Sequence, residues 1–151
     1  MPSLAPSLIV PMLVVLAAGI VFAIQSPLNA TLARDVGSGV VAATVSVGVS
    51  FVVLLALALI QGQGAALARV PAAPPVLWLG GVLGALVVWG MLTSVPVLGI
   101  VTALGILLLG QMSTALVLDA IGAFALPVIP ITLPRVLGVL MIAAGLLLTR
   151  L

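Results

Sequence analysis

The side chains most able to recognise a solute in this 151-residue sequence are amides within long apolar segments. Gln25 and Asn29 are four residues apart, which places them on one face of a helix. Pro27 stands between them, and proline removes one backbone donor and frees a carbonyl. Polar groups inside a bilayer are costly unless paired, so this cluster is a candidate binding site. The alternative is that both amides only bond a neighbouring helix.

Three further residues are candidates for contacting a substrate: Ser46, Trp89 and Gln111. Ser46 stands with Ser50 near the middle of an apolar segment, although hydroxyl groups also bond the carbonyls of their own helix. Trp89 follows Trp78 by eleven residues, which puts it about 16 Å deeper in a helix. There it is either a wall for a substrate ring or an anchor near the opposite membrane interface.

Asp119 is the one carboxylate with a possible role in coupling or gating. It completes an i, i+4, i+8 stripe with Gln111 and Ala115 and falls at the predicted end of a helix. A negative charge there is unfavourable with the helix dipole, so we expect a partner, either Arg135 or backbone donors of the following loop. The alternative role for Asp119 is a structural anchor of that loop.

Several kinds of chemistry are excluded by the residue types that are missing. The sequence has no Cys, His, Lys or Glu, and we find no paired nucleophile and base. It therefore predicts no metal site, no cofactor and no enzymatic activity. A formal charge of +2, spread along the chain, does not indicate a nucleic-acid partner.

Composition identifies the elements that must position these residues as transmembrane helices. Only 4% of the residues are charged and 65% are hydrophobic, far from the balance of a soluble domain. Long apolar runs without alternation favour helices over a barrel. We predict an all-α membrane protein with one transmembrane domain, and its first apolar block is expected to be a retained span. The five spans are predicted at about 7–33, 40–60, 76–92, 97–118 and 133–149.

Three connections are predicted from glycine and proline. Gly37 and Gly39 are expected to form a helix stop and a tight turn after the first span. Thr93, Ser94, Val95 and Pro96 are expected to form a tight turn, because proline disfavours helix at the preceding residue. Residues 121–134 contain three prolines and are too short to span, so we expect an interfacial or re-entrant segment.

The arginines favour neither orientation of the chain in the membrane. With five spans, Arg69 and Arg135 fall on one side of the membrane, and Arg34 and Arg150 on the other. An excess of positive charge normally sets the cytoplasmic side, and here the count is balanced. Either one arginine or a partner protein decides the orientation, or the chain inserts both ways and pairs with an inverted copy. Such a pair would have the inverted-repeat symmetry that transporters use for alternating access.

Four stretches resemble the YdcZ-type family of small five-helix bacterial inner-membrane proteins, in the drug/metabolite transporter superfamily. They are QSPLNATLARDVGSGVVAATVSVGVSF (25–51), LGGVLGA (79–85), LGILLLGQMSTALVLDAIG (104–122) and RVLGVLMIAAGLLL (135–148). The resemblance implies a bundle like that of the small multidrug carriers, an antiparallel dimer, and a small-molecule substrate. Gln25, Asn29, Ser46, Gln111 and Asp119 fall within the matching motifs. The membrane glutamate of the small multidrug carriers has no counterpart, since the chain has no Glu.

Together these observations predict a multi-pass protein of the bacterial inner membrane that transports a small solute. It would work by alternating access as an antiparallel dimer with a second copy or a paired homologue. The alternative is a non-transporting scaffold or accessory subunit of a heteromeric membrane complex, in which the polar residues only join helices.

Overall fold

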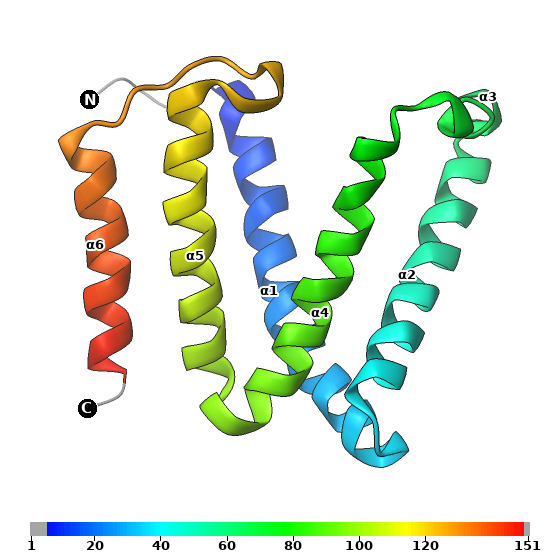
Figure 1. Ribbon diagram of the computed structural model, residues 1–151, viewed down its shortest axis with the longest axis horizontal. Coiled ribbons are helices and arrows are strands. Elements are labelled where there is room, and N and C mark those ends of the chain that lie inside the picture. The colour runs from blue at the N-terminus through cyan, green and yellow to red at the C-terminus, as the bar shows by residue number, and fades with distance from the viewer. Residues whose placement is uncertain (1–5, 150–151) are drawn as a thin grey trace. The chain divides into compact units, whose positions relative to one another are not determined.

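The structure is a computed structural model that describes residues 6–149, and every regular element in this range is helical. The chain divides into two compact units, one ending at Pro96 and the other beginning at Val97, and each is described by itself (Figure 1). The first unit contains α1 (Pro6–Val36), α2 (Gly39–Ile60), α3 (Gly64–Leu67), η1 (Val70–Ala72), η2 (Pro75–Trp78) and α4 (Leu79–Leu98). The second unit contains α5 (Ile100–Ile121), η3 (Ala123–Ala125) and α6 (Leu133–Leu148).

A two-residue turn makes α1 and α2 an antiparallel hairpin. Gly37 adopts a positive φ of 72°, a conformation that glycine reaches without steric cost. Ser38 then caps α2, because its hydroxyl oxygen accepts a hydrogen bond from the Val41 amide at 3.3 Å. The stop predicted at this glycine is confirmed.

The core of the first unit is small and lies near this hairpin turn. Ala42, Ala43 and Leu92 are buried, and Leu32, Ala33 and Val88 pack against them. Alanine on α2 lets neighbouring backbones approach closely, which is how membrane helices associate without a hydrophobic drive. Most large apolar side chains on the described helices remain exposed, as expected when lipid surrounds them.

The predicted turn at residues 93–96 is wrong, because α4 continues through it to Leu98. Pro96 falls within the last turn of α4, so the one i→i−4 hydrogen bond that it removes lies near the end of the helix. The helix ends at Leu98, and the next residue, Gly99, has a positive φ of 78°. The third span is therefore longer than the predicted 76–92, and α5 begins at Ile100 rather than at about residue 97.

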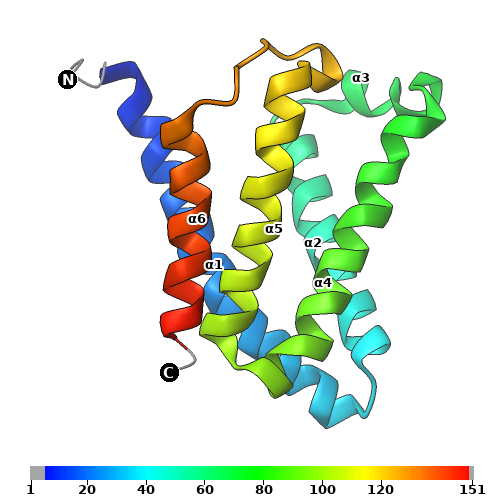
Figure 2. The same ribbon diagram turned by 60° about the vertical axis from the view of Figure 1, so that its left-hand side comes forward.

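The second unit is a hairpin of α5 and α6 joined by an irregular strap, defined here as residues 122–132 (Figure 2). Gly105 marks the close approach of the two helices, because a Cβ there would lie 2.8 Å from Leu146 Cδ1. The strap begins at Gly122, with φ 60° and ψ 40°, and contains the short helix η3. Residues 121–134 thus have the short, interrupted structure expected of them, while their depth in the membrane stays a prediction.

The described helices suit a multi-pass membrane protein. Four stretches are long and apolar enough to cross a bilayer: Ile9–Val36, Gly39–Ile60, Pro75–Leu98 and Ile100–Ile121. Leu133–Leu148 is equally apolar in character but shorter, with 16 residues. A helix of that length covers about 24 Å, so crossing requires its flanking residues or a locally thinner bilayer.

Candidate functional site

Asn29 and Ser46 meet across the α1–α2 hairpin. The Asn29 side-chain amide donates a hydrogen bond of 3.0 Å to the Ser46 hydroxyl oxygen, and both residues are half-buried. Asn29 therefore bonds a neighbouring helix, as the alternative to a binding role requires, whereas Gln25 makes no such bond to another described residue. The Ser50 hydroxyl instead donates to the Ser46 carbonyl of its own helix at 2.9 Å. The Asn29–Ser46 contact therefore contributes to holding α1 against α2.

Replacing Asn29 with Ala should destabilise the protein by about 1 kcal/mol, because interhelical hydrogen bonds in membrane proteins typically contribute that much or less. The measurement is unfolding in detergent of the native chain, Asn29→Ala, Ser46→Ala and the double variant. The double variant should lose little more stability than Asn29→Ala alone, because the two residues share one hydrogen bond. Fully additive losses would mean that the bond does not form.

Gln25 lies beside Asn29 and borders a very small internal space. That space, about 10 Å³, is lined by Phe22, Gln25, Ser26, Asn29, Val88, Met91 and Leu92. Such a volume holds about one water molecule. Ser26, which the sequence analysis did not single out, is buried there and donates to the Phe22 carbonyl at 3.0 Å. In this conformation Gln25 makes no side-chain hydrogen bond to another described residue, so its amide is free to bind a solute if the space opens.

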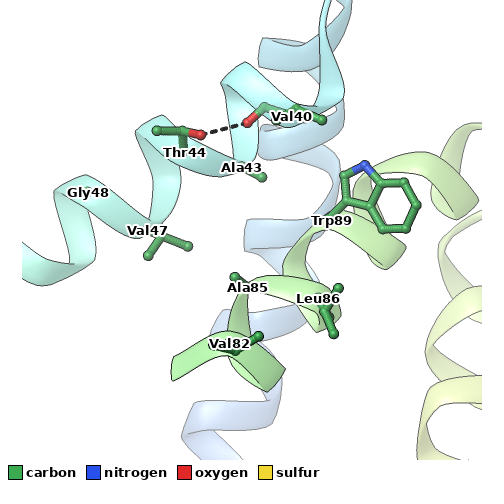
Figure 3. Close-up of a pocket in the computed structure, with 9 residues that line it drawn as sticks. All are labelled: Val40, Ala43, Thr44, Val47, Gly48, Val82, Ala85, Leu86 and Trp89. Atoms are coloured by element: carbon green, nitrogen blue, oxygen red, sulfur yellow. Dashed lines mark hydrogen bonds between the residues drawn. The ribbon is translucent and has the colours of Figure 1, made fainter. Parts of the chain in front are cut away.

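Trp89 belongs to a different and much larger space, an open groove between α2 and α4. The groove has a volume of about 710 Å³ and is lined by Val40, Ala43, Thr44, Val47, Gly48, Val82, Ala85, Leu86 and Trp89 (Figure 3). Thr44 and Trp89 supply its side-chain polar atoms, and none of the lining residues is charged. The Thr44 hydroxyl donates to the Val40 carbonyl at 2.9 Å, which leaves its oxygen able to accept (Figure 3).

Most residues of this groove were missed by the sequence analysis, although a periodic signal was present. Val82, Ala85, Leu86 and Trp89 follow the i, i+3, i+4, i+7 spacing of one helical face. In a segment that is apolar on all sides, this spacing does not stand out from the lipid-facing residues. Trp89 was identified only because of its size and depth.

Gln111 lies on α5 in the second unit, with its side chain exposed. The nearby Ser113 hydroxyl donates to the Leu109 carbonyl at 2.7 Å, so it is satisfied by its own helix. Gln111 makes no side-chain hydrogen bond to another described residue. Its amide, like that of Gln25, is available to an added partner.

Asp119 forms an ion pair with Arg135, which confirms the partner expected from the helix dipole. The side chains are 31% and 30% exposed, respectively. Arg135 also donates to the carbonyls of Ile129 and Pro130 at 3.3 Å each, and the Ile129 amide donates to the Asp119 carbonyl at 2.9 Å. This network ties the end of α5, the strap and the start of α6 together.

Comparison with known proteins identifies one family. Searches of curated proteins and of solved structures find no match to the chain. The model of the family described as "Putative inner membrane exporter, YdcZ" matches residues 10–148. This match includes every candidate residue named above and all the described spans apart from the first residue of Ile9–Val36, and it agrees with a multi-pass protein of the inner membrane. The chain therefore belongs to the YdcZ family that this description names.

Proposed function

We propose that this protein exports a small solute across the bacterial inner membrane by alternating access, as an antiparallel dimer with a second copy or a paired homologue. The family description, "Putative inner membrane exporter", supports the outward direction of transport and the location in the inner membrane. The balanced arginines support the inverted pairing, because the positive charges favour neither orientation.

The observation that carries the proposal is the groove between α2 and α4. Its volume of about 710 Å³ falls within the range of small-molecule sites in proteins. Trp89 on one wall provides a flat apolar surface against which a substrate ring can pack. A cleft of this kind between helices is where a transporter of this size would hold its substrate.

The remaining candidate residues take complementary roles in this proposal. Gln25 and Gln111 are candidates for hydrogen bonds to the substrate outside the groove, each within its own unit, because neither amide has a hydrogen-bond partner among the described residues. Asn29 and Ser46 exchange their mutual bond for contacts with substrate when the helices move. Asp119 contributes to gating through its ion pair with Arg135, which links two helices across the strap.

Export can be measured without knowing the substrate. Vesicles containing the purified protein are loaded with a bacterial small-molecule extract, and the solutes that leave are identified by mass spectrometry. Gln25→Ala and Gln111→Ala should lower the export rate about two- to tenfold, the effect of one lost neutral hydrogen bond. Gln63→Ala is the matched control, since Gln63 lies in the loop after α2. Equal loss of export and of folded dimer would make the two amides structural.

A second candidate function, a non-transporting scaffold or accessory subunit, is favoured by a specific observation. Asn29 and Ser46 already satisfy each other, and the space beside Gln25 holds about one water molecule. Side chains used only to join helices would have this arrangement. Under this alternative the loaded vesicles retain all solutes, whichever variant they contain.

A further inference from the structure

The charges of the first unit all lie outside the groove between α2 and α4. Arg34 and Asp35 stand in the last turn of α1, and Arg69 precedes η1, all of them exposed. Within the first unit, no carboxylate borders the groove to balance a bound cation, and no arginine borders it to balance an anion. An ion transferred from water into such a site loses its hydration without a compensating partner.

The indole of Trp89 does not change this conclusion for cations. An aromatic face does attract a cation, but a single face gives only a modest contribution compared with the hydration that the ion loses. Recognition of quaternary ammonium groups relies on cages of several aromatic rings. Among the residues that line this groove, Trp89 is the one aromatic side chain.

The polar atoms of the groove suit an uncharged molecule. The indole Nε1 of Trp89 has no hydrogen-bond partner among the described residues, and an indole N–H only donates. The Thr44 oxygen keeps the capacity to accept while donating to Val40. One neutral donor and one neutral acceptor, in a groove that is otherwise apolar, match a ring system carrying a hydroxyl or amide group.

We propose that the α2–α4 groove binds uncharged aromatic molecules that carry a hydroxyl or amide group, and that it discriminates against ions. This inference rests on the proposed function, because it names the class of solute that the exporter carries. An acyl chain would use neither Trp89 Nε1 nor Thr44, and the groove residues provide no third polar side chain for a headgroup.

The chain offers a direct optical test. It has two tryptophans, and Trp78→Phe leaves Trp89 as the single reporter in the groove. The full chain in this background is reconstituted into vesicles of lipids with brominated acyl chains, which quench exposed indoles. The probes are 4-(4-nitrophenyl)benzyl alcohol and its trimethylammonium counterpart, which share the two rings and differ in charge. Binding is read from quenching of Trp89 by the nitroaromatic group and from protection against bromine.

A steric variant and its matched control separate binding in the groove from partition into lipid. A Cβ added at Gly48 or at Gly19 meets no atom within 4 Å, so both positions accept a larger residue. Gly48 lines the groove and Gly19 does not. Gly48→Phe should weaken binding of the alcohol at least tenfold, whereas Gly19→Phe should leave it within twofold. The alcohol should bind at least tenfold more tightly than the cation.

Three results would overturn the inference. The cation could bind as tightly as the alcohol. Bromine quenching could persist at all probe concentrations, as for a groove filled by lipid. Trp89 could respond to neither bromine nor probe, as for a groove covered by a second copy. Export from vesicles loaded with the bacterial extract distinguishes the two proposals: solute loss without probe binding removes only this inference, and probe binding without solute loss removes the exporter.

Discussion

Arg135→Gln is expected to destabilise the second unit by about 2–3 kcal/mol. The change leaves the partly buried Asp119 carboxylate without its partner and also removes the donors to the Ile129 and Pro130 carbonyls. Breaking a fully buried ion pair reduces stability by more than 2–3 kcal/mol, and breaking an exposed one by less. The expected loss is intermediate because these side chains are 30% and 31% exposed. Thermal unfolding in detergent measures the loss, and the strap should become more sensitive to protease.

Removing the carboxylate of Asp119 should reduce stability less than removing the guanidinium of Arg135. Asp119→Asn removes the ion pair but leaves Arg135 donating to both carbonyls, so we expect a loss of about 1 kcal/mol. The double variant should be no less stable than Arg135→Gln, because it contains no unpaired charge. Asp35→Asn is the control, since Asp35 is exposed and its side chain makes no hydrogen bond to another described residue. Native stability in both single variants would contradict the observed network.

The contacts of this site that could be predicted from the sequence are those of its few polar residues, because each has few possible partners. In a chain with 4% charged residues, a carboxylate at a helix end has few possible partners, and Arg135 was one of the two expected from the helix dipole. Asn29 could likewise be expected to bond a neighbouring helix, although its particular partner Ser46 could not be chosen. The turn at Gly37 was predictable because positive φ is costly for other residues.

The parts that could not be predicted depend on shape within uniformly apolar helices. The α2–α4 groove results from the positions of Val47, Gly48 and Ala85, whose residue types occur throughout the spans. The local preference of Pro96 predicts a turn, but helix continues for two residues beyond it. Gly99, with positive φ, proved the stronger signal for the end of α4.

The largest functional effect is expected for the orientation of the chain in the membrane. If all five long helices cross, Arg34 and Arg69 lie on opposite sides, in the last turn of α1 and in the loop after α2. Arg34→Gln leaves two arginines on the side of Arg69 against one, so that side should become cytoplasmic. Arg69→Gln should produce the opposite orientation. A reporter fused at the C-terminus should change from signals on both sides to a signal predominantly on one side.

The two variants control for each other, because each removes one exposed guanidinium and neither arginine belongs to the core or to the groove. If the antiparallel homodimer is the working form, each variant alone should export poorly, since every copy then inserts the same way. Producing Arg34→Gln and Arg69→Gln together supplies both orientations and should restore export. A native chain with one strong orientation that exports at its full rate would exclude pairing with an inverted copy of itself. A paired homologue would then have to supply the opposite orientation.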